Sequence, residues 1–385
     1  MGDIYAKAAV VIAAHSSADA HGGCLSTDHS RNEALATFTT TLDGETATIS
    51  LRKHTFRHGG TPAHCTVDCG WETKLESRGW TFQETILAKR ILHCTGSEMA
   101  WQCSHTMCEC STESDVDLDA RFSEPFTKLL GRNPQYKPSR EHPPSSHLLQ
   151  CDWRDLVGLY TRRSFAFPEK DKLPALAGIV STLSQAAPTV FPRADYMFGL
   201  WRGCLISDLL WCRGSDGTTL PRRLPQDTAP SWSWASLSHG PVVFPADSTN
   251  FEGDRGFKQA CRVENVVCLP KSTRQIFEST GSGRIEILAR VEQISLDRDV
   301  KVKGKVITLD APNDINLLGT FYTVVLGWIS RGGTIEPHGL VLVESWLESW
   351  LEGDSFKRVG YFRGPYIARS TVGSIHGGER RINLI

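Results

Sequence analysis

The stretch SRGWTFQETILAKRILHCTGSEMAWQC, at residues 77–103, gathers the side chains best suited to chemistry. If GWTFQETILAK is helical, Trp80 and Glu84 lie four residues apart on one face, with Gln83 beside them. A carboxylic acid held against an indole can serve as a general acid or base. The same residues can instead be structural, with Glu84 or Arg78 joining the helix to a sheet and Trp80 filling the core. We favour the structural interpretation because no partner nucleophile lies nearby in sequence, and Glu84 stays the catalytic candidate.

Cysteine chemistry is a second possibility in the same stretch. His93 and Cys94 point to opposite faces if they lie on a strand, so they cannot form a dyad with each other. A pairing of Cys94 with His105 stays open. Buried free cysteines are commoner than nucleophilic ones, which favours packing here too.

A metal site is the third possibility, because zinc prefers four thiolate or imidazole ligands. The spacings of the cysteines are not those of standard zinc knuckles. No phosphate-binding loop, GxGxxG, HExxH or GxSxG motif occurs either. We therefore expect no cofactor and no metal, with zinc as the alternative. The candidate ligands are Cys103, His105, Cys108 and Cys110 in CSHTMCEC, and His64, Cys65 and Cys69 in HCTVDC.

Composition limits the classes of partner. The 42 basic and 43 acidic residues leave a net charge of -1, which argues against binding to nucleic acid. No apolar run is long enough to span a bilayer, and the first residues lack the basic region of a secretory signal. We expect a cytoplasmic protein whose 12 cysteines are free thiols or metal ligands rather than disulfides.

The elements that must position these side chains are short in the first 110 residues. Helix formers predict helices over MGDIYAKAA and over LESRGWTFQETILAK, and β-branched or alternating patterns predict strands. The polar, proline-rich stretch that follows indicates an excursion or a domain boundary. The predicted strands are VVIAAH, ETATISLRKH (residues 45–54), RILHC and EMAWQC.

The middle of the chain predicts helices over residues 151–163, 169–185 and 196–213. In the second of these, Asp171 is a plausible cap and Pro174 stands where a first turn tolerates it. The third is apolar nearly all round, so we expect it to be buried and to carry both Trp201 and Trp211.

The segment APSWSWAS, at residues 229–236, precedes a change of pattern. Trp232 and Trp234 alternate in it, so on a strand they would share a face, either around a pocket or as anchors for packing. From there the sequence alternates with period 2, which predicts antiparallel strands. The fold class expected is α+β, with a partial α/β region over 1–110, a proline-rich excursion over 111–150, a helical segment over 151–240 and a β-rich region over 241–385.

Several motifs in order give the sequence a family resemblance. They are MGDIYAKAAVVIAA, GGC, RGWTFQE, RILHC with EMAWQC, DKLPALAGI, GLW with LLW, and APSWSWAS. In order and spacing they resemble the fungal heterokaryon-incompatibility (HET) domain proteins, and FKRVGYFRG is similar to the family's closing strand. The positions that match the family's motifs are Arg78, Gly79, Trp80, Gln83, Glu84, Trp101, Cys103, Trp232 and Trp234.

The resemblance implies self/non-self recognition and programmed cell death through contacts with another protein, and it gives the motif positions no catalytic role. Family members normally carry further motifs before the point that matches MGDIYAKAA, so we expect an N-terminally truncated HET domain with an exposed sheet edge. The family's distant likeness to NAD-cleaving Toll/interleukin-receptor folds rests on that earlier part, so we expect no NAD hydrolysis. The alternative is a non-redox enzyme, a cyclase or isomerase of fungal secondary metabolism, binding a small molecule in a Trp-lined pocket.

Overall fold

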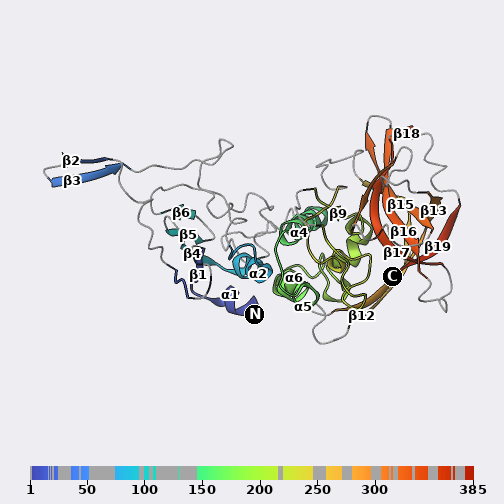
Figure 1. Cartoon of the computed structure of the whole chain (residues 1–385), viewed down its shortest axis with the longest axis horizontal. Helices are drawn as coiled ribbons and strands as arrows, with labels where there is room; N and C mark the ends of the chain where they lie inside the picture. Colours follow the sequence, from blue (N-terminus) through green and yellow to red (C-terminus); the bar gives the residue numbers. More distant parts are fainter. Residues whose placement is uncertain are drawn as a thin grey trace. The chain divides into compact units, whose positions relative to one another are not determined.

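The computed structural model divides the chain into two compact units, Met1–Pro138 and Ser139–Ile385 (Figure 1). It describes residues 2–15, 17, 19, 21–24, 36–42, 45–51, 74–94, 99–103, 107–109, 130, 145–215, 220–245, 257–270, 280–295, 305–311, 314, 320–331, 334–345, 354–365, 367–368 and 378–385.

The first unit is built on a four-stranded sheet with the order β1-β4-β5-β6. Strand β1 runs parallel to β4, whereas β5 is antiparallel to both β4 and β6. A separate hairpin is formed by β2 and β3. The elements are α1 (Gly2–Lys7), β1 (Val11–Ala14), β2 (Ala36–Leu42), β3 (Glu45–Leu51), α2 (Gly79–Leu87), β4 (Arg90–Cys94), β5 (Met99–Cys103) and β6 (Met107–Glu109).

Helix α2 and strand β4 follow one another with only two residues between them. The Thr81 hydroxyl donates to the carbonyls of Leu75 and Arg78, which fixes the first turn of the helix. Phe82 and Ile86 lie four positions apart and are both buried, so the helix has an apolar face. The helices and strands expected in the first 110 residues are confirmed within the described residues, whereas most of the proline-rich excursion lies outside them.

The second unit begins with helices α4 (Ser146–Tyr160), α5 (Pro168–Asp171) and α6 (Pro174–Ala186). The first two expected helical segments are therefore confirmed, and Pro174 stands in the first turn of α6. The expectation that Asp171 caps this helix was wrong. Leu173 is the N-cap, because Asp171 already belongs to the last turn of α5.

The third expected helix, over residues 196–213, was also wrong. The segment forms the hairpin β7 (Tyr196–Met197) and β8 (Leu200–Trp201), then η4 (Arg202–Cys204), α7 (Leu205–Asp208) and β9 (Cys212–Arg213). Phe198 and Gly199 have φ values of 49° and 93°, which end any continuous helix. The segment is buried as expected, but its apolar side chains enter the core from turns.

The rest of this unit is a nine-stranded sheet, antiparallel apart from the pairing of β17 with β19. Its core includes a cluster of Ile294, Val341, Val343, Val359 and Phe362. The antiparallel strands expected in this part of the chain are thus confirmed, and so is the α+β class. After β10 (Val242–Val243) the strands are β11 (Phe257–Gln259), β12 (Arg262–Pro270), β13 (Gly281–Ile294), β14 (Val306–Leu309), β15 (Phe321–Arg331), β16 (Thr334–Glu344), β17 (Asp354–Arg363), β18 (Ile367–Ala368) and β19 (Glu379–Leu384).

Helices α4, α5 and α6 gather beside this sheet (Figure 1).

Among the described residues, none of the helices has the length and apolar character that crossing a bilayer requires.

Candidate functional site

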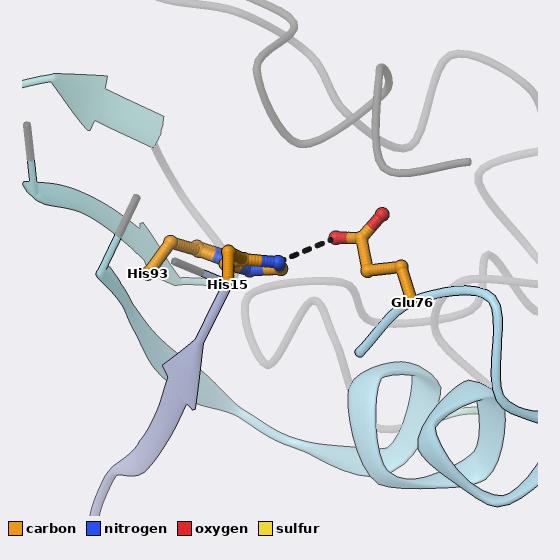
Figure 2. A group of neighbouring side chains, drawn as sticks. All are labelled: His15, Glu76 and His93. Carbon is orange, nitrogen blue, oxygen red and sulfur yellow. Dashed lines mark hydrogen bonds and ion pairs between the residues drawn. The ribbon is translucent and has the colours of Figure 1, made fainter. Parts of the chain in front are cut away.

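The first unit brings two imidazoles and one carboxylate together. His15 follows the end of β1, His93 lies in β4, and Glu76 lies in the turn that leads into α2. Figure 2 shows the two rings side by side with the Glu76 carboxylate pointing toward them. One nitrogen from each ring and one carboxylate oxygen all lie within 4.8 Å of one another.

Strand register explains why the two histidines meet. Ala13 pairs with His93 in the parallel register of β1 and β4, so the two residues share a face of the sheet. His15 stands two positions beyond Ala13, and its backbone N–H continues the ladder by donating to the Cys94 carbonyl over 2.9 Å. The period of two then returns the His15 side chain to the His93 face.

The contacts form a chain across the site. A Glu76 carboxylate oxygen lies 3.5 Å from Nδ1 of His15. Nε2 of His15 lies 2.9 Å from Nδ1 of His93, and Nε2 of His93 lies 2.8 Å from the Gln102 side-chain oxygen. The rings are stacked at an interplanar angle of 23°. Gln102 reaches His93 from β5, because it pairs with Ile91 and so faces the same side.

The side chains that make these contacts are buried, which makes charge on them unfavourable. The side chains of His15 and Glu76 are only 6% and 8% exposed, and Gln102 and His93 are buried. Burial lowers the pKa of His15, because a charged imidazole loses its hydration there. Binding of a proton at His15 is therefore disfavoured, and the neutral ring keeps a lone pair on one nitrogen.

The predicted catalytic candidate lies elsewhere in the unit. Glu84 is half-buried on α2 and hydrogen-bonds the hydroxyl of Tyr5 from α1. Burial, followed by this carboxylate, raises the pKa of Tyr5. Gly79 and Gln83 are buried, Trp80 is half-buried and Arg78 is exposed. These positions support a structural role for Glu84, which joins α2 to α1.

The sulfur candidates are only partly within the described residues. Burial, together with the neighbouring Cys24 thiol, raises the pKa of Cys94, which makes it a poor nucleophile. Cys103 and Trp101 are half-buried on β5, and Cys108 lies in β6. Cys24, Cys94 and Cys103 are free thiols. The remaining candidates, His64, Cys65, Cys69, His105 and Cys110, lie outside the described residues.

In the second unit the expectation that Trp232 and Trp234 lie on a strand was wrong. The segment is a turn followed by η5 (Trp234–Ser236), because the Ser233 hydroxyl accepts from the N–H of Ala235 and stabilises the turn. Both indoles are fully buried and donate to backbone carbonyls, Trp232 to Gly283 and Trp234 to Gly199. These contacts are those of packing anchors.

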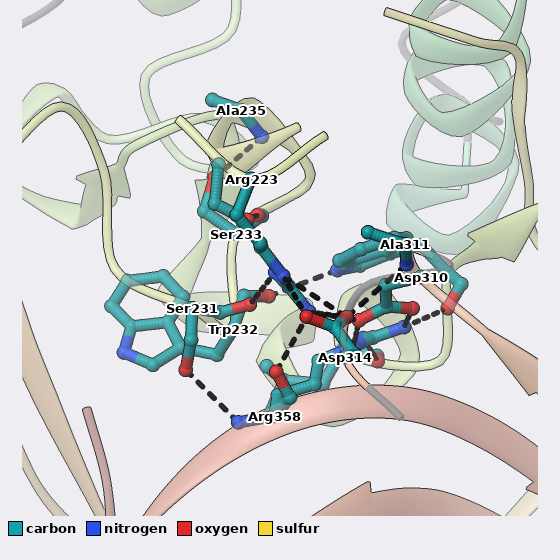
Figure 3. A network of polar contacts seen from close by, with 12 residues as sticks. Arg223, Ser231, Trp232, Ser233, Ala235, Asp310, Ala311, Asp314 and Arg358 are labelled. Atoms are coloured by element: carbon teal, nitrogen blue, oxygen red, sulfur yellow. Dashed lines mark hydrogen bonds and ion pairs between the residues drawn. The ribbon is translucent and has the colours of Figure 1, made fainter. Parts of the chain in front are cut away.

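A polar network fixes this Trp-containing segment to the sheet (Figure 3). The Arg223 guanidinium bonds Asp310, Asp314 and the Ser231 carbonyl. Burial lowers the pKa of Arg223, but the carboxylates of Asp310 and Asp314 outweigh it, so the net shift is upward. Arg358 completes the network from β17 and stacks 3.5 Å from the centroid of the Trp211 ring.

Sequence reasoning missed His15 and Glu76. It considered His93 only as a partner for a cysteine. A histidine at the end of a predicted strand was a weak signal, and it became informative only with the register of β1 against β4. Glu76 had no signal of its own, because a turn residue reveals nothing about the sheet face that it will reach.

Comparison with known proteins gives one match. Residues 1–84 match the family model of the heterokaryon incompatibility protein (HET). This confirms the expected resemblance over that stretch, which contains His15, Glu76 and Glu84, whereas His93 lies just beyond it. Neither a curated protein nor a solved structure matches the chain.

Proposed function

We propose that this heterokaryon-incompatibility-type protein acts in self/non-self recognition and cell-death signalling by contacting another protein. The observation that carries the proposal is the match of residues 1–84 to the HET family model. The near-neutral net charge of -1 supports a protein partner over nucleic acid. We place the protein in the cytoplasm of a fungus, where the family's recognition systems act.

The edge of the first sheet offers a surface for such a contact. Within the described residues β1 pairs only with β4, so its outer side can accept another strand. Ile12, on β1, is 59% exposed, and the nearby Val10 and Ile4 are also exposed. An edge strand with apolar side chains can bind a partner by adding a strand to the sheet, with the side chains giving specificity. We propose β1 as the contact strand.

The alternative, an enzyme with a Trp-lined pocket, gains no support from the contacts described. The four tryptophans that could line such a pocket are buried: Trp201, Trp211, Trp232 and Trp234. Trp211, for example, donates to the Trp232 carbonyl and stacks against the Arg358 guanidinium. The expectation that Trp201 and Trp211 share one helix was wrong, since one lies in β8 and the other beyond α7. We therefore propose the signalling function alone.

Controlled expression tests the proposal. The full chain is placed under an inducible promoter in a filamentous fungus, beside an unrelated protein of similar size induced to the same level. We expect uptake of a vital dye and arrested growth only in the strain that expresses this chain. Normal growth at equal protein level would contradict the death-signalling function.

A further inference from the structure

We propose that the first unit binds one divalent transition-metal ion through His15, His93 and Glu76, with zinc as the ion that this ligand set favours. Each histidine supplies one ring nitrogen and the glutamate supplies a carboxylate oxygen. Two imidazoles with one carboxylate form a recognised zinc ligand set that leaves a fourth position for water or another ligand. The inference does not depend on the proposed signalling function.

The distances fit an ion after small side-chain movements. Zinc binds imidazole nitrogen and carboxylate oxygen at about 2.0–2.2 Å, which places tetrahedral ligands about 3.4 Å apart. The three ligand atoms lie within 4.8 Å of one another. Rotations that move each atom by about 1 Å bring them onto one centre. These are side-chain adjustments, and the strand register that aligns the histidines stays unchanged.

Gln102 supports His93 as a ligand. Its side-chain oxygen lies 2.8 Å from Nε2 of His93 and accepts a hydrogen bond from it. The proton is thereby held on Nε2, and the lone pair of Nδ1 faces the site. Histidines that bind metals characteristically donate their other N–H to such a partner, which fixes both tautomer and ring orientation.

Metal binding would connect three segments of the unit: the end of β1, the turn before α2, and β4. Because such a site does not exist in the unfolded chain, the binding free energy would add to the stability of the fold. The proposed contact strand β1 would then depend on the ion for its position.

The test uses Co²⁺ as a spectroscopic substitute for zinc in the chelator-treated full-length protein. We expect visible d–d absorption that saturates at one ion per chain, and competition by Zn²⁺. Glu76→Gln and His93→Gln keep side-chain size and should each abolish this signal and the zinc-induced rise in Tm. His21→Gln is the matched control, since His21 is exposed in the same unit, and should behave as wild type.

Two further outcomes keep the test decisive. X-ray absorption of the zinc-loaded wild-type protein should show nitrogen and oxygen neighbours with the multiple-scattering pattern of imidazole, whatever the folding of the variants. A first shell of sulfur alone, with thiolate-to-cobalt charge transfer, would assign the metal to the cysteine-rich stretch and overturn the proposal. So would the absence of any bound ion, or an unchanged cobalt spectrum in folded Glu76→Gln.

Discussion

Arg358 and Asp310 form a fully buried ion pair joined by two hydrogen bonds, from Nε to Oδ2 over 2.9 Å and from Nη2 to Oδ1 over 3.1 Å. The same guanidinium donates to the carbonyls of Leu209 and Trp211. The pair therefore connects β17 to the apolar turn between α7 and β9. Burial lowers the pKa of Arg358, and Asp310 opposes that effect.

Loss of the Asp310 charge should destabilise the second unit strongly. Asp310→Asn leaves the charges of Arg358 and Arg223 buried without their shared carboxylate, and we expect a loss of about 3–5 kcal/mol in unfolding free energy. Glu264→Gln is the control, because Glu264 contacts Arg262, whose side chain is 71% exposed. It should cost less than about 1 kcal/mol. Equal effects of the two substitutions in urea denaturation would contradict this account.

Gly199 should not tolerate a side chain. Its φ is 93°, and an added Cβ would lie 2.5 Å from the Trp234 ring. We expect Gly199→Ala to cost about 3 kcal/mol or more, from backbone strain together with overpacking. Gly203→Ala, where nothing lies within 4 Å of the added atom, should stay within about 1 kcal/mol of wild type. Thermal unfolding followed by circular dichroism measures both, and a tolerated Gly199→Ala would refute the packing described for Trp234.

Lys172 should make stability depend on pH. It is 1% exposed, donates to the Leu237 carbonyl over 2.6 Å, and lies 5.5 Å from the centroid of the Trp234 ring. Burial lowers its pKa to about 7, from 10.5. Between these values the unfolded chain binds more protons than the folded one, so stability should rise with pH from 7 to 9, by at most about 1.4 kcal/mol per pH unit.

The matched control for this titration is the neighbouring Lys170, which is exposed. Lys172→Met should flatten the rise in stability, whereas Lys170→Met should retain it. Denaturant unfolding at several pH values compares the three proteins. A slope that survives in Lys172→Met would assign the effect to another group.

The Glu84 side chain should stabilise the folded first unit through its hydrogen bond with Tyr5. Their hydrogen bond joins α1 to α2, and a double-mutant cycle of Tyr5→Phe and Glu84→Gln should give a coupling of about 0.5–1 kcal/mol. The exposed pair of Lys7 and Asp3, joined at 3.0 Å, should show less. Additive effects of Tyr5→Phe and Glu84→Gln would remove the structural role proposed for Glu84.

Sequence patterns predicted the elements that have a clear period. The alternation in β13 survives as alternating burial over residues 285–290, whereas the interior positions of β16 and nearly all those of β17 are buried, because both faces of these strands are covered. The continuous apolar run at 196–213 was misread, because composition does not reveal where φ turns positive at Phe198 and Gly199. The meeting of His15 with His93 required a parallel register, which no local pattern encodes.

The most direct measurement of the central claim, cell-death signalling through the β1 edge, compares two isoleucines of the first unit. Ile12 lies on β1 and is 59% exposed, and Ile49 lies on the β2–β3 hairpin and is 50% exposed. The account predicts that Ile12→Glu abolishes death in the induced fungal strain at unchanged protein level, while Ile49→Glu kills as wild type does. Undiminished death with Ile12→Glu would contradict it.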